Sequence, residues 1–450
     1  MRYKGVQYDK RFYITDKDLW LHYCKNVYVY QKNLTAMTVE NAVLLPCRSI
    51  SYHEASGEYF QYEGGICDTD LNFLSGTVRI NEENPGYNSI VRSYHVPVEE
   101  ICSCDEDVIF GGFLMGHFGH FILESMSRFW YFLEYMASGK KVVFTMVFGE
   151  HTAWIDDFLT LLGLPKEKML FVDKPTRFKS MIVPDESMRP WGGVYSAEYL
   201  LPYEIIRRNV KVDSPYKRIY LSRRKITGKG FTVFGEEYFE KFFTDHGFVV
   251  IEPEEYTLEQ QISMIKNADE IACVLGTLSH FAMFCRPGTK FIMLSRVDDD
   301  ALYPQCLINA ASMVDWYLVD VSLNFLLGHR YDGVVMLGIT SNWKRFVKEH
   351  FGEVIDGDTL RDNPTMVVNY MKAWCKWAVQ QEKTLMLDSI DFMALFNRFC
   401  VIVLGENIPV EYVNNFFAVS PKAESKKREI EKLRHENEEL KRILANIKNM

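Results

Sequence analysis

A chain of 450 residues, 48% of them hydrophobic, is long enough for about two or three domains with buried cores. Its net charge of −9 argues against nucleic acid as a partner, because binding a phosphate backbone requires a basic face. The ten cysteines form no paired C-x-x-C motifs, so neither a zinc site nor a disulfide framework is expected. With no signal-peptide pattern and no apolar run of membrane-spanning length, we expect a cytoplasmic protein; peripheral contact with the inner face of a membrane stays open.

Residues 1–100 predict strands and turns. Short β-prone runs lie between glycine and proline turns, at Ala42–Leu45, Tyr59–Tyr62, Thr77–Ile80 and Ile90–Val96. We therefore expect an antiparallel, β-rich subdomain over this region.

Residues 101–215 predict a first α/β domain, which begins with the strand and glycine turn VIFGG at Val108. Further strands are expected at Lys141–Phe148, Met169–Val172 and Met181–Val183. Helices are expected from near His117 to about Tyr135, from Trp154 to Leu162, and around Pro202 to near Arg208. Gly163 should end the second of these helices.

Residues 216–330 predict a second α/β domain. Four apolar runs indicate buried strands at Arg218–Ser222, Phe248–Ile251, Glu270–Leu275 and Lys290–Leu294. The first intervening helix should end at Gly247 in a left-handed cap, and the next should begin with a capping box of Thr257 and Gln260. Strands that alternate with helices at this interval predict a parallel sheet with right-handed crossovers.

The residues after these strands are candidates for binding an anion, because parallel sheets bind ligands beyond the carboxyl ends of their strands. The segment Lys217–Lys229 has six basic residues and no acid, and guanidinium groups bind phosphate bidentately. A helix opening after Gly276 would add free N–H groups, and the fourth strand ends at Ser295 and Arg296. The candidate binding residues are Arg223, Arg224, Lys225, Gly276, Thr277, Ser279 and His280. The alternatives are a solvated basic loop and, for His280, a core histidine.

After Arg296 the segment Trp316–Leu327 is apolar, and residues 331–419 predict helices at Asp362–Gln380 and Asp388–Val403. We expect these segments to pack back across both α/β domains. Residues 420–450 predict a coiled-coil oligomerisation tail. Its heptad seam consists of Ile430, Leu433, Asn437, Leu440, Leu444 and Ile447. Opposite charges beside the seam favour a parallel homodimer through residues 430–447, with a trimer as the main rival. The alternative is a solvated helix packed on its own domain.

Four motifs, in order along roughly residues 105–300, resemble glycosyltransferase family 61. They are HFGHFILE at 117–124, YLSRRK, IEPEEYTLEQQISMIKNADEI and LGTLSHFAMFCRPGTKFIML. The chain departs from the family pattern at His117, Leu275 and Phe281, which stand for an asparagine, a histidine and an asparagine. The resemblance implies a GT-B-like α/β fold, in which two Rossmann-like domains face a cleft. Residues 101–215 would form the acceptor side, and residues 216–330 would bind the nucleotide sugar.

The resemblance also implies an activity, that of an inverting glycosyltransferase. It would transfer a sugar from a UDP-sugar to a glycan or glycolipid acceptor, as in the synthesis of a capsule or another cell-surface polysaccharide. His120 and Glu124 are four residues apart on one helix face, and one of them would be the general base for the acceptor hydroxyl. The alternative for His120 is a hydrogen-bonded core histidine.

We expect no obligatory metal, because the run Asp298-Asp299-Asp300 falls in a predicted loop and is more typical of a solvated acidic tip. A competing hypothesis is a non-catalytic sugar-nucleotide-binding or scaffold protein, assembled through its tail. In that case the three departures from the family pattern would mark lost activity.

Overall fold

The computed structural model describes residues 11–14, 24, 28–29, 33–54, 57–78, 89–189, 194–225, 231–296, 303–323 and 333–380. The chain divides into two compact units. The larger comprises Met1–Ile226, Glu237–Val321 and Ser341–Gly352, and the smaller comprises Thr227–Glu236, Ser322–Thr340 and Glu353–Met450. Both units combine helices with strands, so the α/β class predicted from the sequence is confirmed.

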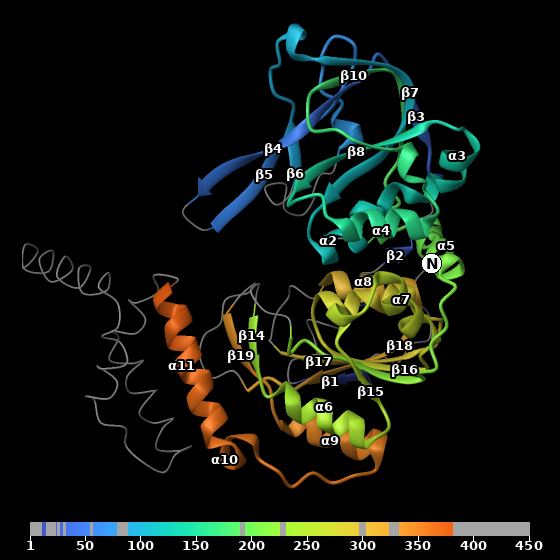
Figure 1. The fold of residues 1–450 in the computed structure, drawn as a ribbon. Coiled ribbons are helices and arrows are strands. Elements are labelled where there is room, and N and C mark those ends of the chain that lie inside the picture. The colour runs from blue at the N-terminus through green and yellow to red at the C-terminus, as the bar shows by residue number, and fades with distance from the viewer. Residues whose placement is uncertain are drawn as a thin grey trace, which may run out of the picture. The chain divides into compact units, whose positions relative to one another are not determined.

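A six-stranded sheet in the larger unit contains the strands predicted for the second α/β domain (Figure 1). Its order is β1-β18-β17-β16-β13-β15, and every neighbouring pair is parallel. The bounds are β1 Phe12–Tyr13, β13 Arg218–Leu221, β15 Val249–Ile251, β16 Glu270–Val274, β17 Lys290–Ser295 and β18 Asp315–Asp320. The four predicted strands and their parallel arrangement are therefore confirmed.

Helices cover both faces of this sheet, α7 and α8 on one side and α6 and α9 on the other (Figure 1). The bounds are α6 Glu236–Asp245, η7 Pro253–Glu255, α7 Leu258–Asn267, η8 Thr277–Phe284, α8 Tyr303–Ser312 and α9 Ser341–Phe351, where η marks a 3-10 helix. The predicted capping box is present, since the Thr257 hydroxyl accepts from the Gln260 N–H and the Gln260 side chain accepts from the Thr257 N–H. Gly247 ends α6 with φ +80°, as its left-handed cap requires.

The strand β18 and its neighbour β1 were not predicted. The sequence indicated only an apolar segment from Trp316, which we expected to pack across the domains, whereas β18 extends the parallel sheet beside β17. Phe12 pairs with Leu318 at the edge of that sheet. Arg11 fixes this pairing, because its Nη1 atom lies 2.6 Å from Asp315 Oδ1 and donates to the Trp316 carbonyl. A two-residue strand is too short to show a period of two.

An eight-stranded mixed sheet forms the other half of the larger unit, in the order β6-β5-β4-β10-β7-β8-β9, with β3 paired to β10. The bounds are β3 Ala36–Glu40, β4 Val43–Glu54, β5 Gly57–Cys67, β6 Ser89–Arg92, β7 Cys102–Met115, β8 Lys141–Phe148, β9 Met169–Phe171 and β10 Thr176–Pro184. The strands of the N-terminal region thus join the same sheet as those of the first α/β region. The predicted strand Thr77–Ile80 does not begin at Thr77, because Ser75–Thr77 is a 3-10 turn, η2. The last two residues of that predicted strand lie outside the described residues.

The strand β7 has buried side chains on both faces of this sheet, and its register shifts between Phe110 and Gly112. Ile109 and Leu114 belong to the core that also contains Phe121 and Phe158, whereas Phe110 belongs to a separate core on the other face. The helices are α2 Phe118–Leu123, η4 Ser125–Tyr131, α3 Phe132–Ala137, α4 Ala153–Leu162, η6 Ala197–Leu200 and α5 Leu201–Asn209, with η3 Val98–Glu100 and η5 Lys166–Lys168 as single 3-10 turns. Gly163 follows α4 with φ +99°, which confirms the predicted end of that helix.

The helix predicted from His117 to Tyr135 is broken after Leu123. The Tyr199 hydroxyl donates to the Leu123 carbonyl at 3.0 Å, and the Tyr203 hydroxyl donates to the Ile122 carbonyl. These two carbonyls therefore have tyrosine donors, and the next residues continue as a 3-10 helix. The break leaves Glu124 at the C-terminal cap of α2.

The smaller unit contains two parallel strands, β14 Phe231–Phe234 and β19 Gly333–Met336, with helices α10 Thr359–Asp362 and α11 Pro364–Gln380. The predicted helix Asp362–Gln380 is confirmed, with its start at Pro364. The predicted helix at 388–403 and the seam at 430–447 lie outside the described residues.

A separate small sheet in the larger unit joins β2 Tyr28–Val29, β11 Met188–Arg189 and β12 Val194–Tyr195. In the part of the chain described, no helix is both long and apolar enough to cross a membrane.

Candidate active site at the strand ends

Two arginines meet at the carboxyl ends of three adjacent strands. Arg223 follows β13, Gly276 follows β16 and Arg296 follows β17, and these strands are neighbours in the sheet. A Cβ atom added at Gly276 would lie 3.2 Å from Arg296 Nη2 and 3.4 Å from Arg223 Nη1. The two guanidinium groups therefore approach the same glycine, and both side chains are only half-buried. Two positive charges brought together in this way favour a bound anion.

Gly276 has a backbone conformation that other residues avoid, with φ +152° and ψ −155°. It opens the 3-10 helix η8, whose first residues are Thr277, Leu278 and Ser279. The Ser279 hydroxyl lies 2.5 Å from the Gly276 carbonyl, so the side chain of Ser279 packs inside the turn. A side chain at position 276 would both strain the backbone and displace the arginines.

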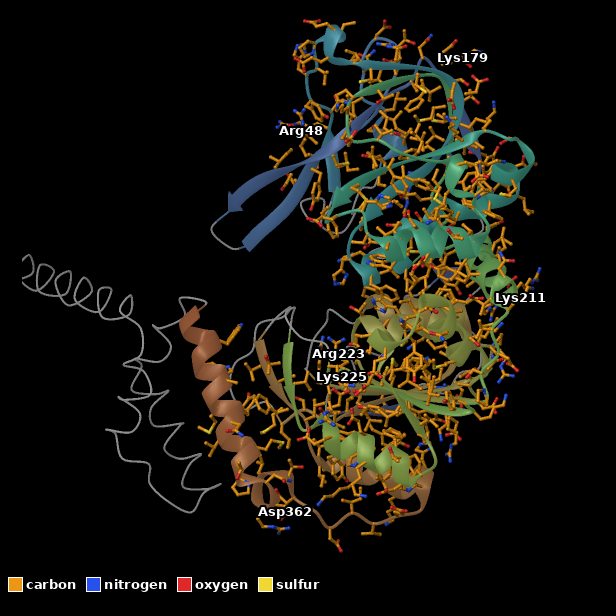
Figure 2. The ribbon with its side chains drawn as sticks, in the orientation of Figure 1. Arg48, Lys179, Lys211, Arg223, Lys225 and Asp362 are labelled. Carbon is orange, nitrogen blue, oxygen red and sulfur yellow. The ribbon has the colours of Figure 1, made fainter. Side chains whose placement is uncertain are left out.

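The next two basic residues along the chain, Arg224 and Lys225, lie against carboxylates. Arg224 Nη1 is 2.7 Å from Glu240 Oε2 on α6, and Lys225 pairs with Glu252 and Glu255 around η7. Hydrogen bonds to Glu252 and then to Glu255 raise the pKa of Lys225 above its usual value. Figure 2 labels Arg223 and Lys225 at the end of β13. The structure therefore brings Arg223 to Gly276 and places the side chains of Arg224 and Lys225 on acids of the same domain.

His120 and Glu124 form a hydrogen-bonded pair at the end of α2. His120 Nδ1 lies 2.5 Å from Glu124 Oε1, and the side-chain exposures are 25% and 3%. The His120 ring also packs edge-on against His117 and Phe148, with centroids 5.2 and 5.5 Å away. A buried carboxylate that accepts from Nδ1 orients the imidazole, so that Nε2 of His120 can act as a general base.

His280 connects the two groups of residues. It lies on η8, one turn beyond Gly276, and a Cβ atom added at Gly119 of α2 would lie 3.2 Å from His280 Nε2 and 3.4 Å from His117 Cε1. Its Nδ1 atom is 2.8 Å from Gln305 Oε1 on α8. Loss of hydration lowers the pKa of His280 to about 4, and the nearby His120 and His117 act in the same direction. The ring is therefore neutral at physiological pH.

Residues 118–292 match the family model of Glycosyltransferase 61. No curated protein matches the chain. The Glycosyltransferase 61 match contains both groups of candidate residues, including His120, Glu124, Arg223, Gly276 and His280. It agrees with the resemblance carried by the sequence motifs, and it supports a transferase of sugars.

The three departures from the Glycosyltransferase 61 pattern lie in different environments. Leu275 and Phe281 are 2% and 1% exposed and belong to the main core, where the Phe281 ring packs 5.0 Å from that of Phe118. His117 is exposed at the start of α2. Phe281 thus adds apolar packing between η8 and α2, Leu275 lies in the same core, and His117 adds an imidazole beside the candidate base.

Two residues of the site lie outside the Glycosyltransferase 61 match. The sequence placed Arg296 at a strand end but gave no reason to select it as a binding residue. Its approach to Gly276 in the structure supplies that reason. Gln305 was missed altogether, because a single glutamine in an apolar helix carries no motif.

Among the described residues, no cluster of three or more His, Cys, Asp or Glu side chains could hold a metal ion. The run Asp298-Asp299-Asp300 falls outside the described residues.

Proposed function

We propose that this chain is an inverting glycosyltransferase that transfers a sugar from a UDP-sugar to a hydroxyl group of a glycan or glycolipid. The observation that carries the proposal is the convergence of Arg223 and Arg296 on Gly276, one helical turn from a histidine that contacts α2. Positive groups for a leaving diphosphate and a base for an acceptor hydroxyl are the two requirements of such a transfer. The family match over both regions supports the assignment.

In the proposed reaction, His120 Nε2 removes the proton from the acceptor hydroxyl while Glu124 holds Nδ1. The acceptor oxygen forms a bond to the anomeric carbon, and the bond from that carbon to the β-phosphate oxygen breaks, so the electron pair leaves with UDP. Attack on the side opposite to the leaving group inverts the anomeric configuration. Arg223, Arg296 and the N–H groups of the Gly276–Ser279 turn stabilise the charge that develops on the diphosphate.

The remaining candidate residues have lesser parts in this proposal. Arg224 and Lys225 contribute through their charge more than by contact, since carboxylates already hold them. Transfer needs no obligatory metal, because the guanidinium pair neutralises the leaving group. The proposed architecture is GT-B-like, with the six-stranded sheet as the nucleotide-sugar domain and residues 101–215 as the acceptor domain. The proposed setting is the cytoplasmic face of a membrane where surface polysaccharide, such as capsule, is made.

A screen of nucleotide-sugar donors tests the proposal. Purified chain is incubated with each donor and simple hydroxyl acceptors, and mass spectrometry records the nucleotide released. We expect turnover with a UDP-sugar and, by NMR of the product, an inverted anomeric configuration. Tight donor binding without turnover of any donor would instead favour the non-catalytic sugar-nucleotide-binding or scaffold protein, for which the buried Leu275 in place of the family's histidine is the specific argument.

The tail is proposed to join two copies of the chain. Light scattering of the full chain should give a dimer at micromolar concentration, whereas a chain ending at Val419 should give a smaller species, because the heptad seam is removed. Turnover should be retained, since the candidate site lies upstream. An unchanged oligomeric state after truncation would contradict the role of the tail, and a trimer of the full chain would support the rival oligomeric state.

A further inference from the structure

Gln305 is the centre of a buried polar network that the proposed function does not use. It lies on α8 and is 1% exposed, as is Asn309 one turn later. Its Nε2 atom donates to the Ser279 carbonyl at 3.1 Å and to Asn309 Oδ1 at 2.8 Å. Its Oε1 atom lies 2.7 Å from the Ser279 hydroxyl and 2.8 Å from His280 Nδ1. A fully buried amide with partners on both sides has one orientation.

The Ser279 carbonyl decides that orientation. A carbonyl oxygen can only accept a hydrogen bond, so the Gln305 atom that faces it must be the amide nitrogen. The amide oxygen then faces His280, and because this oxygen can only accept, His280 Nδ1 must carry a proton. In a neutral imidazole the second nitrogen is then bare. His280 thus presents a lone pair on Nε2.

The bare nitrogen faces the start of α2. A Cβ atom at Gly119 would lie 3.2 Å from Nε2, so a larger residue at position 119 would crowd this nitrogen. The titratable groups that act on His280 from α2 are His120, His117 and Glu124, and Gln305 faces it from α8. His280 therefore lies between the turn proposed for the diphosphate and the pair proposed as base. In a donor substrate, the sugar is the part that lies between its diphosphate and the attacking hydroxyl.

We infer that Gln305 is a positioning residue, which holds His280 as the Nδ1–H tautomer so that Nε2 accepts a hydrogen bond from a hydroxyl group of the donor sugar. The sugar contact rests on the proposed function, whereas the tautomer does not. Gln305 lies beyond the residues of the family match, so the inference comes from the contacts of α8 alone.

The tautomer is measured directly on the full chain. Selective ¹⁵N labelling of histidine and long-range ¹H–¹⁵N spectra distinguish a protonated ring nitrogen from a bare one, and His280→Gln identifies the His280 signals. At neutral pH we expect Nδ1 protonated and Nε2 bare. Gln305→Leu removes the acceptor and should abolish this preference. Gln305→Glu keeps an acceptor, so it should keep the tautomer and raise the pH at which His280 titrates, because a carboxylate stabilises the imidazolium.

Asn309→Leu is the matched control. It removes a partner of the same buried amide, on the side away from His280, and leaves the Ser279 carbonyl to orient Gln305. A purely structural network predicts equal effects for Asn309→Leu and Gln305→Leu, whereas the positioning role predicts a changed tautomer only for Gln305→Leu. In turnover, Gln305→Leu should raise the KM for the donor about two- to tenfold and change kcat less, as expected for the loss of one hydrogen bond made throughout the reaction.

A protonated Nε2 in the wild-type chain, or a tautomer that Gln305→Leu leaves unchanged, would overturn the inference. If Gln305→Leu does not fold, an unchanged titration of His280 in Gln305→Glu would overturn it as well. A normal donor KM in Gln305→Leu together with a changed tautomer would overturn the sugar contact. A wild-type chain that turns over no donor, but has the expected tautomer, would contradict the proposed function and leave the positioning role supported.

Discussion

Replacing His120 with alanine is expected to lower the rate of sugar transfer by about 10²–10⁴-fold, the usual contribution of a general base. UDP binding should stay near its wild-type value, because the base acts on the acceptor. Glu124→Gln should cause a smaller loss, since the imidazole remains but loses the carboxylate that orients it. Steady-state kinetics for turnover and calorimetry for UDP binding separate the two effects.

His151→Ala is the control for this experiment. His151 Nε2 lies 2.8 Å from Asp156 Oδ1, so the described residues include a second, more exposed histidine–carboxylate pair outside α2. Its loss should leave turnover within about threefold of wild type, because the proposed reaction does not use this pair and a surface pair contributes under about 1 kcal/mol to stability. Normal turnover in both His120→Ala and Glu124→Gln would move the base to another residue.

Arg223→Ala and Arg296→Ala are each expected to weaken UDP binding about tenfold or more. A charge-assisted hydrogen bond to phosphate contributes about 1.5–3 kcal/mol, and about 1.4 kcal/mol corresponds to a factor of ten. Gly276→Ala should have a comparable or larger effect, because its Cβ would lie 3.2 Å from Arg296 Nη2 and 3.4 Å from Arg223 Nη1. Calorimetric titration with UDP measures each loss, and thermal unfolding checks that the fold is kept.

Arg224→Ala and Lys225→Ala serve as matched comparisons, since both remove one positive charge from the same loop. Their partners are Glu240 and the pair Glu252 and Glu255, so each is expected to weaken UDP binding by less than Arg223→Ala does. Equal losses for all four arginine and lysine variants would indicate a general effect of charge and would contradict the assignment of the anion to Gly276.

The sequence predicted what local patterns determine. The strands β13, β16 and β17 were found because each is a continuous apolar run between turns, and their parallel order then brought Arg223 and Gly276 to one edge of the sheet. The pairing of His120 with Glu124 followed from their spacing of four. These features depend on residues close together in the chain.

Features that depend on distant residues were not predicted. The break in the helix after Leu123 depends on Tyr199 and Tyr203, about 80 residues later, whose hydroxyls reach its last carbonyls. The orientation of His280 depends on Gln305, which no spacing rule connects to it. In both cases a side chain from another element makes a hydrogen bond that local sequence cannot predict. One such bond accompanies the end of a helix, and the other orients an imidazole ring.

The pairing of β1 with β18 also has a consequence for how the chain is made. Phe12 and Tyr13 cover the last strand of the parallel sheet, and a two-residue strand there hides N–H and C=O groups that could otherwise pair with another molecule. Trp316, whose carbonyl accepts from Arg11 in this pairing, is 305 residues away along the chain. At ribosomal rates of about 5–20 residues per second, the N-terminal segment would wait on the order of 15–60 s for its partner to be synthesised. Until then Phe12 and Tyr13 have no strand to pair with, so this edge of the sheet closes only after β18 has been synthesised.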